Sequence, residues 1–356
     1  MKTRKDKFGN INQREIANEL GVSQSLVSKI LAGRNEASPE MTGKILRLVQ
    51  EKGYRPNMLV RGVLSGKTKT IGVVIPADGF FSEIVHGIHD CLTRAGYAMF
   101  LVWNDDHMVA PDSKKELEYI HSLVDRRVDG IILRPTHDEV SQMYFNEVHL
   151  RGIPMVIVVR EIAPAHYDFV GTDDRAGGEL AAKHLLELGH RCLGQIAGPS
   201  IVSTSRGRRL GFESAVADFG PTASCLTIEA PGFSNAKTQI LELLQSTPRP
   251  TAVFAANDDA AAEIYVIAAS LGLRIPDDLS VIGFGDLVFA PHLTPPLTTL
   301  RQNPYSIGEN AAALMLTKCA SKHKKKPAPE VMNIKFLPTL VVRGSTCAVK
   351  QRSQSV

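Results

Sequence analysis

This 356-residue sequence has few cysteines, and it lacks long apolar runs. Its five cysteines are scattered without C-x-x-C spacing, which argues against both a disulfide framework and a zinc or redox motif. No stretch of about 18 apolar residues occurs, and the charged N-terminus has no hydrophobic signal region. We therefore expect a cytoplasmic protein with no membrane partner, whose cysteines are reduced small hydrophobic residues or surface thiols: Cys91, Cys192, Cys225, Cys319 and Cys347.

Motifs of common enzymes are also missing. Gly283-Phe-Gly285 lacks the third glycine and the following helix of a dinucleotide fingerprint, and neither a P-loop nor a nucleophile elbow is present. Glu83, His86 and Asp90 share one face of an expected helix, which is more typical of a solvated surface than of a metal site. The sequence therefore predicts no enzyme, no metal and no cofactor.

The segment 13–34 has the pattern of a helix-turn-helix. Gly21 ends the first helix, and Ser23 stands where a second helix needs an N-cap. The apolar faces of both helices can pack together through Ile16, Ala17, Leu20, Val27, Ile30 and Leu31. A plain helical hairpin would give the same pattern. The second helix, however, also presents hydrogen-bonding groups suited to bases and phosphates, namely Gln24, Ser25, Ser28 and Lys29.

A third helix and the distribution of charge support a DNA-binding head. Ser38 and Pro39 form an N-cap and first-turn signal, and the helix is expected to continue to Gly53. Residues 1–70 contain 14 Lys and Arg against 6 Asp and Glu, which leaves 27 basic and 31 acidic residues in the remainder. The net charge of +4 therefore combines a basic head with a mildly acidic body. A basic head suits phosphate binding, although a solvated basic face would give the same count.

Beyond Thr70, strand-like and helix-like segments alternate in two series. This alternation is the pattern of βαβ units in parallel sheets, so the fold class is α/β. Two sheets imply two lobes, with a ligand site at the carboxyl ends of their strands. The expected helices include 114–124, 178–188 and 260–271, and the expected strands are 71–75, 97–103, 130–133, 155–159, 192–197, 225–229, 252–255 and 281–284.

The order of these features resembles the lactose and galactose repressor (LacI/GalR) family over about residues 13–347. The resemblance rests on the helix-turn-helix, on Gly53-Tyr-Arg-Pro-Asn57, and on the strand Ile71-Gly-Val-Val-Ile-Pro76. It implies a three-helix head and a hinge followed by a periplasmic-binding-protein-like effector domain of two lobes. The expected boundaries are 1–56 for the head, 57–69 for the hinge, 70–346 for the effector and dimerisation domain, and 347–356 for a polar tail.

The resemblance also implies how the lobes divide and what the protein does. Three chain crossings near Val170, Arg301 and Glu330 would give lobe one about 70–170 with 302–329, and lobe two about 171–301 with 330–346. The implied function is a sequence-specific DNA-binding regulator, a repressor of carbohydrate metabolism genes controlled by a small effector. A homodimer would bind a two-fold symmetric operator in the nucleoid. The tail carries no leucine heptads, which argues against a coiled-coil tetramer.

DNA contacts are expected from the second helix and from the hinge. Similar repressors insert leucines from a hinge helix into the minor groove. Val63 stands at that position here, and Gly62 lowers helix propensity by about 1 kcal/mol relative to alanine, so hinge folding should depend strongly on the operator. The predicted DNA-binding residues are Ser23, Gln24, Ser25, Ser28, Lys29, Asn57, Arg61, Val63 and Leu64.

Effector contacts implied by the resemblance lie at strand ends that face the expected cleft. Phe80 and Phe81 follow the first strand, although a core-facing pair is the alternative. Arg208 matches the family's ligand-binding arginine, and Asn257 can both donate to and accept from a hydroxyl. Asp173 and Asp277 are interpreted as helix caps and turn formers. The full predicted set is Phe80, Phe81, Arg134, Arg160, Thr204, Arg208, Phe233, Asn257 and Gln302.

Two positions depart from the family pattern. Gly285 stands where relatives often have a ligand-binding aspartate, and Val159 replaces the acid of an Ile-Asp-Arg type ending. Two hydroxyl acceptors are therefore missing while arginines remain. We expect an unusual effector for the family, an anion such as a sugar acid or sugar phosphate. The main alternative is a solute-binding protein for a small carbohydrate, but such a protein would not need the head.

Overall fold

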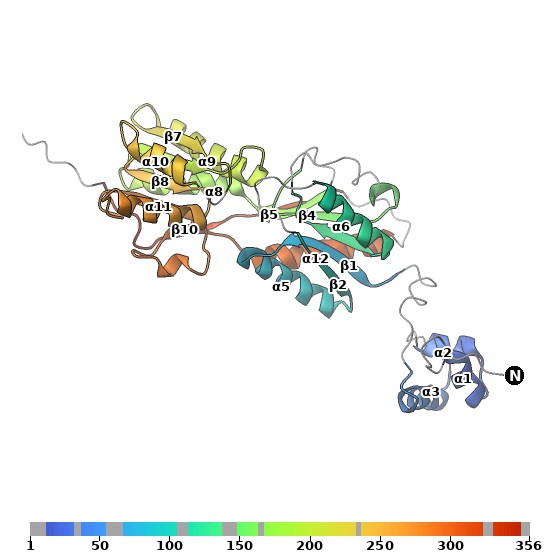
Figure 1. The fold of residues 1–356 in the computed structure, drawn as a ribbon. Coiled ribbons are helices and arrows are strands. Elements are labelled where there is room, and N and C mark those ends of the chain that lie inside the picture. Colours follow the sequence, from blue (N-terminus) through green and yellow to red (C-terminus); the bar gives the residue numbers. More distant parts are fainter. Residues whose placement is uncertain are drawn as a thin grey trace, which may run out of the picture. The chain divides into compact units, whose positions relative to one another are not determined.

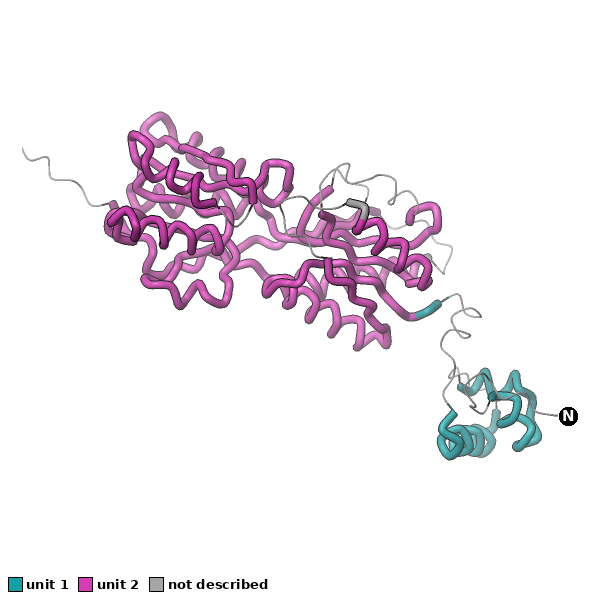
Figure 2. The backbone as a smooth tube through the Cα atoms, viewed as in Figure 1, with its two compact units in different colours: residues 1–68 teal, residues 69–356 magenta. Residues whose placement is uncertain are grey.

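The computed structural model describes residues 12–31, 37–54, 67–104, 113–136, 148–162, 167–232, 236–322 and 330–349. The chain divides into two compact units, residues 1–68 and residues 69–356 (Figure 2). The predicted DNA-binding and effector-binding residues therefore belong to separate units.

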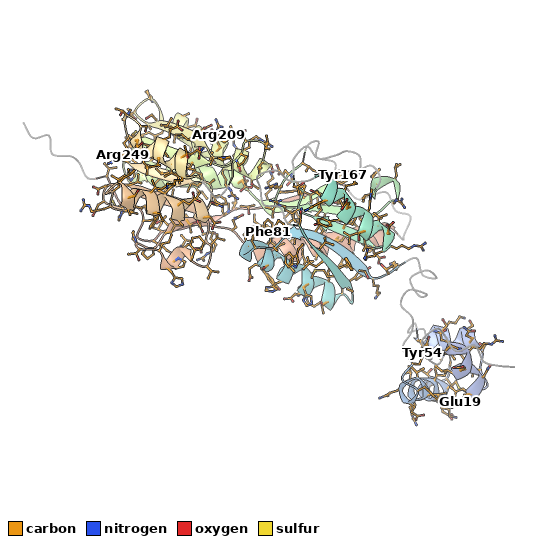
Figure 3. All side chains as sticks on the ribbon, viewed as in Figure 1. Glu19, Tyr54, Phe81, Tyr167, Arg209 and Arg249 are labelled. Atoms are coloured by element: carbon orange, nitrogen blue, oxygen red, sulfur yellow. The ribbon has the colours of Figure 1, made fainter. Side chains whose placement is uncertain are left out.

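Three short helices form the core of the first unit, as the sequence predicted. Asn12 and Glu15 make a reciprocal capping box at the first helix, and Ser38 accepts from the backbone N–H of Met41 at the third. Lys52 forms an ion pair with Glu19, whose place in the head Figure 3 shows. The helices are α1 (Gln13–Glu19), α2 (Gln24–Leu31) and α3 (Pro39–Glu51), and their buried faces meet through Ile16, Ala17, Val27, Ile30, Ile45 and Leu48.

The second unit contains two six-stranded sheets of almost entirely parallel strands (Figure 1). The sheet of lobe one has the order β11-β5-β4-β3-β1-β2, and that of lobe two has the order β12-β10-β9-β8-β6-β7. In lobe two, β12 pairs antiparallel with β10. The strands are β1 (Thr70–Pro76), β2 (Ala98–Asn104), β3 (Gly130–Leu133), β4 (Met155–Val158), β5 (Asp168–Thr172), β6 (Cys192–Ala197), β7 (Ser224–Glu229), β8 (Ala252–Ala255), β9 (Ser280–Gly285), β10 (Thr298–Arg301), β11 (Asn333–Phe336) and β12 (Thr339–Val341).

Helices cover both faces of each sheet, so the central strands are apolar on both sides. In β1, Ile71, Val73 and Ile75 face one core cluster, and Val74 belongs to the cluster on the opposite face. Lobe two is built in the same way, with separate core clusters on its two sheet faces. The helices are α5 (Gly79–Arg94), α6 (Ser113–Asp125), α8 (Asp174–Glu187), α9 (Ser203–Phe219), α10 (Lys237–Gln245), α11 (Asp258–Ser270), η1 (Ala290–His292) and α12 (Pro304–Lys322).

Glycines allow one helix pair in each lobe to pack at backbone contact. A Cβ atom at Gly178 of α8 would lie 2.1 Å from the backbone oxygen of Arg208, and one at Gly211 of α9 would lie 2.0 Å from that of Arg175. In lobe one, Gly87 of α5 and Gly308 of α12 make the same kind of contact. These distances leave no room for any larger residue. In lobe two, the close packing of α9 on α8 places Arg208 against α8.

The chain crosses between the lobes at three places, of which the third lies later than expected. β5 and α8 are separated at Asp173, and β10 and α12 by residues 302–303, near the first two predicted crossings. Residues 333–336 still pair with β5 in lobe one, whereas residues 339–341 pair with β10 in lobe two. The third crossing therefore follows Phe336 and not Glu330. The sequence 333–336 alternates polar and apolar residues, because β11 is an edge strand with alternate residues exposed, so it lacks the continuous apolar run of a central strand.

The beginning of the expected polar tail is packed onto lobe two. The backbone N–H of Val349 donates to the oxygen of Leu188 at 3.0 Å, and the carbonyl of Cys347 lies 3.0 Å from Nε2 of the buried His190. Since a carbonyl can only accept, Nε2 of His190 is the protonated nitrogen. Burial lowers the pKa of His190, which favours this neutral form. All five cysteines are free thiols, as expected.

Candidate functional site

The candidate DNA-binding surface lies at the start of α2. The Oγ of Ser23 accepts from the backbone N–H of Leu26 at 3.1 Å, which caps the helix. Ser23, Gln24 and Ser25 are exposed, and Ser28 and Lys29 are half-buried on the same helix. Buried Val27 and Ile30 fix the rotation of α2, so that these polar side chains are carried on its other faces. The predicted hinge contacts Asn57, Arg61, Val63 and Leu64 lie outside the described residues.

In the effector domain, Arg208 of α9 pairs with Asp174 at the start of α8. The Nε of Arg208 donates to Oδ1 of Asp174 at 2.8 Å, and its Nη1 donates to the backbone oxygen of Ala256 at 2.7 Å. The guanidinium also lies 3.8 Å from the ring centre of Phe284. The two side chains of the pair are only 8% and 10% exposed. This arrangement fixes the plane of the guanidinium, as directional anion recognition requires.

Burial raises the pKa of Asp174 to about 6, although the neighbouring Arg208 guanidinium acts in the opposite direction. The carboxylates of Glu161 and Asp173 add to the rise, because like charges disfavour ionisation. Asp173 itself caps α8 by accepting from the backbone N–H of Ala176, as the sequence predicted. Sequence reasoning did not single out Asp174, since two adjacent aspartates before a helix are ordinary capping residues.

Arg134 and the two phenylalanines meet in lobe one. Arg134 follows β3, is 4% exposed, and places its guanidinium 5.5 Å from the ring centre of Phe81. Phe81 lies at the start of α5 (Figure 3) and is 7% exposed, and the Phe80 ring meets it edge-on at 5.2 Å. Both rings pack against the lobe-one core. The core-facing interpretation therefore describes Phe81 well, and Phe80 is partly accessible.

Arg160 follows β4 in an unusual backbone turn. The N–H of Arg160 donates to the oxygen of Val158 at 2.8 Å, and Val159 between them has φ +67°. A β-branched residue is rarely found at positive φ. The turn directs the buried Arg160 guanidinium to the backbone oxygen of Thr136. The backbone N–H of Thr136 donates to Glu116 at 2.9 Å. The expected strand end at residue 159 is thus replaced by a strained turn.

The beginning of α9 contacts the segment that follows Arg160. Ser203 Oγ accepts from the backbone N–H of Glu161 at 2.9 Å, which joins the two lobes at this point. No side-chain cap bonds the first turn of α9, which opens with the N-cap residue Val202. Thr204 is 5% exposed, and Ser205 is 2% exposed with an Oγ that has no hydrogen-bond partner among the described residues. Thr204 and Arg208 are one helical turn apart on α9.

Two other predicted effector residues have structural partners. Oδ1 of Asn257 accepts from the backbone N–H of Ala260 at 2.9 Å, so this oxygen caps α11. Oε1 of Gln302 accepts from the hydroxyl of Thr172 at 2.9 Å, which joins the first and second crossings. The amide nitrogen of Asn257 donates to Oδ2 of Asp259 at 3.4 Å. Phe233 lies outside the described residues.

Asp258 explains why the segment around Gly285 is rich in glycine. It is fully buried and accepts from the Thr299 hydroxyl at 2.6 Å and from the backbone N–H of Leu287 at 2.7 Å. A Cβ atom at Gly283 would lie 2.3 Å from its Oδ1. Gly285 has φ +142°, which side-chain-bearing residues rarely adopt. The local backbone therefore favours glycine at position 285 and disfavours an aspartate there.

A carboxylate that sequence reasoning missed lies next to Gly285. Asp286 accepts from Arg301 and from Arg343, each at 2.6 Å, and its side chain is 8% exposed. Arg301 ends β10 and Arg343 follows β12, so this carboxylate joins the strand before the second crossing to the strand after the third. No sequence signal linked these residues, because Arg301 lies 15 positions and Arg343 lies 57 positions from Asp286, and sheet pairing brings them together.

Within the described residues, no group of three or more His, Cys, Asp or Glu side chains is arranged to hold a metal ion. None of the described helices combines the length and the apolar content that a membrane crossing requires. Glu83, His86 and Asp90 are more than half exposed, as expected for a solvated helix face.

Comparison with known proteins gives a consistent result. Residues 9–50 match a helix-turn-helix family, and residues 182–346 match a periplasmic binding protein-like domain. The HTH-type transcriptional regulator DegA of Bacillus subtilis is 32% identical over 339 residues, which cover 93% of this chain and 97% of the relative. The chain belongs to the LacI/GalR family. As a member it is a DNA-binding transcriptional regulator with a small-molecule effector and is not an enzyme.

Solved structures agree with this family membership. A LacI family regulator from Enterococcus faecium with bound ribose is 30% identical, with a TM-score of 0.67, covering 79% of this chain and all of that one. The lac repressor dimer bound to operator has a TM-score of 0.77 at 22% identity, covering 95% of this chain and all of that one, and it shows the same fold. The match of the head excludes a solute-binding protein without a DNA role. Regulators of this family act on chromosomal DNA, hence in the cytoplasm.

Proposed function

We propose that this chain is a repressor of carbohydrate metabolism genes and that an anionic effector controls its affinity for a two-fold symmetric operator. The observation that supports it best is the buried, fixed Arg208 guanidinium at α9 together with the absence of acids at Val159 and Gly285. The E. faecium relative was solved with ribose, a neutral sugar. In the present chain the hydroxyl acceptors that would serve such a ligand are replaced by a valine and a glycine.

Operator recognition is assigned to the start of α2. Gln24, Ser25, Ser28 and Lys29 are the side chains that would enter the major groove, with Gln24 suited to adenine and Lys29 to guanine. The capping bond at Ser23 supports this proposal, because it orders the N-terminal turn of α2 while Ser23, Gln24 and Ser25 stay exposed. Ser23 would also meet the phosphate backbone.

Selection of bound sites from random double-stranded DNA tests the operator proposal. We expect a two-fold motif, and Gln24→Ala should lower affinity for it by about tenfold or more and relax one base position in each half-site. Lys44→Ala is the matched control, because Lys44 is an exposed cation of α3 that pairs with Glu40 on the same helix. Equal effects of the two substitutions, or no enriched motif at all, would contradict the proposal.

Residues 57–69 are proposed to be a hinge that folds on the operator, with Asn57, Arg61, Val63 and Leu64 at the DNA. Residues 70–346 would then form the effector-binding and dimerisation domain, and the protein would reside on the nucleoid. Amide hydrogen exchange of this segment, measured for the free and the operator-bound protein, tests the hinge. Protection that is the same in both states would contradict folding on DNA.

The effector is proposed to lie against Phe80, Phe81, Arg134, Arg160, Thr204, Arg208, Phe233, Asn257 and Gln302. The partly accessible Phe80 ring supports an apolar contact, and the two lobe-one guanidinium groups support an anion such as a sugar acid or sugar phosphate. Binding would reorient the lobes and change the spacing of the hinges. Because coupling is reciprocal, operator and effector must change each other's affinity by the same factor.

Isothermal titration calorimetry with matched pairs of compounds tests the effector class. D-gluconate and D-ribose 5-phosphate should bind, whereas D-glucose and D-ribose should bind at least tenfold more weakly. Val159→Asp restores an acid and should reverse this preference. Tight binding of a neutral sugar, with none of its acid or phosphate, would contradict the anionic class and leave the regulator function intact.

A further inference from the structure

The Arg208–Asp174 pair of the proposed effector site includes a titratable carboxyl, Asp174, which contacts the same guanidinium as the proposed ligand. Arg208 donates from Nε to Asp174 and from Nη1 to the backbone oxygen of Ala256. Among the described residues, none accepts from its Nη2. An anion bound there would therefore be the second anion on one guanidinium.

Two anions that share one buried cation repel each other in a poorly solvated place. The Asp174 side chain is 10% exposed, and a Cβ atom at Gly207 would lie 2.9 Å from its Cβ, so α9 closes over it. Water cannot screen the repulsion well at such a site. A proton on Asp174 would remove it, and the protonated carboxyl would still accept from Nε of Arg208 through its carbonyl oxygen.

The charges around Asp174 come from each segment that packs on it. α9 supplies Arg208, the residue before α8 is Asp173, and the segment after β4 supplies Glu161. Glu161 is itself paired with Lys335 of β11 at 2.5 Å. Burial raises the pKa of Asp174 to about 6, which places its titration just below neutral pH. A further anion beside it would raise that pKa again and move it into the physiological range.

We propose that binding of an anionic effector at Arg208 is coupled to uptake of a proton by Asp174, so that the site binds its effector more tightly as the pH falls. This inference rests on the proposed anionic effector and adds its regulation. At a fixed effector concentration, an acid shift would therefore raise the fraction of protein that carries effector, and with it the effect on operator binding. The repressor would then respond to the combination of an anionic metabolite and acidification.

The test is calorimetry of D-gluconate and of inorganic sulfate with the full-length protein at pH 6 and pH 8. Both anions keep their charge across this interval, so any change in affinity belongs to the protein. We expect affinity to be about five- to tenfold higher at pH 6. Titrations in buffers of different ionisation enthalpy should show a net uptake of protons near pH 7. This second measurement needs no variant.

Two variants assign the proton. Asp174→Asn keeps an oxygen for Nε of Arg208 but cannot titrate, so its affinity at pH 8 should equal or exceed that of the unmodified protein, with no pH dependence and no proton uptake. Asp173→Asn is the matched control, because asparagine retains the helix cap and removes a neighbouring charge. It should keep most of the pH dependence.

Three results would overturn the proposal: the same pH dependence in Asp174→Asn, no proton uptake in the unmodified protein, or no binding of either anion to any variant. Operator binding, followed by fluorescence anisotropy without effector, distinguishes these failures from failure of the proposed function. A protein that binds its operator but shows no proton linkage is still a regulator. A protein that binds no DNA is not the repressor proposed above.

Discussion

The two lobes share one kind of helix packing but place their charges differently. The pair α5–α12 in lobe one and the pair α8–α9 in lobe two both cross at glycines in backbone contact. The ion pair that joins α5 to α12, Arg94–Glu309, has side chains 65% and 38% exposed, whereas Arg208–Asp174 has side chains 8% and 10% exposed. The same packing therefore serves a solvated contact in one lobe and an interior charge in the other.

An interior charge is expensive to desolvate, which is why its position is informative. A buried ion pair adds little stability compared with apolar residues of similar size, and it is strongly destabilising when one partner is lost. Exposed pairs are worth little. We infer that the pair in lobe two is explained better by its place in the proposed effector site than by a contribution to folding. Changing matched residues in the two lobes separates these roles.

The largest difference is expected between Arg208→Met and Arg94→Met. The first substitution leaves Asp174 buried without its guanidinium and should lower the free energy of unfolding by about 3 kcal/mol at pH 8, and less at pH 5, where Asp174 is protonated. The second removes an exposed contact and should leave the melting temperature almost unchanged. Thermal unfolding of both variants at the two pH values is the measurement. Equal losses would remove the distinction between the lobes.

The glycine crossings should behave alike in stability and differently in function. Gly211→Ala and Gly308→Ala each place a Cβ atom 2.0 Å from a backbone oxygen, so each should cost about 2–3 kcal/mol. Only Gly211→Ala should also weaken effector binding, because α9 carries Arg208. Gly43→Ala in α3 is the control, since a Cβ atom there meets nothing within 4 Å, and it should stabilise the head by about 0.5–1 kcal/mol. Unchanged melting of Gly211→Ala would show that the helices can separate without cost.

The pH dependence of stability should differ between the unmodified protein and Asp174→Asn. Burial raises the pKa of Asp174 from 3.8 to about 6, so this group stabilises the folded state fully below about pH 4, and the contribution is lost as the pH rises through 6. Between pH 5 and pH 7.5 the unmodified protein should lose about 1–2 kcal/mol relative to the variant. Denaturant unfolding at several pH values checks this, and parallel curves would mean that Asp174 titrates normally.

The smallest effect on stability is expected at the exposed contact between α5 and α12 of lobe one. The Tyr305 hydroxyl donates to Asp90 at 3.0 Å. Hydrogen bonds from His89 and from Tyr305 lower the pKa of Asp90. Because these groups are solvated, Tyr305→Phe should change the melting temperature by no more than about 1 °C and leave effector binding unchanged. A clear loss of effector affinity in this variant would mean that the lobe-one helix pair takes part in the response.

Local patterns predicted the head and most of the sheet strands. Ser23, Ser38 and the apolar faces of the first three helices give an unambiguous helical period, and the isolated apolar runs such as 130–133 and 252–255 became strands with those bounds. β5, β10, β11 and β12 were not predicted, although β5 is buried along its whole length. They are short, and β11 and β12 are partly exposed, so their sequences lack the continuous apolar run of a buried strand.

The candidate site was predicted in part. Arg134, Arg160 and Arg208 were proposed from strand ends and from the family resemblance, and all three are buried. Their partners did not follow from the sequence, because Asp174, Thr136 and Ala256 lie 24 to 48 positions away and are joined by hydrogen bonds. The turn at Val159 was also missed, since its sequence continues the apolar run of β4.

The sequence by itself determined the helix-turn-helix, the basic head and the α/β class, because each of these depends on residue type and spacing within a short segment. Only the tertiary structure decided which charges became neighbours. The glycine crossing of α8 and α9 and the closure of α9 over Asp174 excluded solvent from one carboxylate and left others exposed. Since desolvation depends on the atoms that surround a group, the pKa of Asp174, and with it the proposed proton coupling, is a property of the fold.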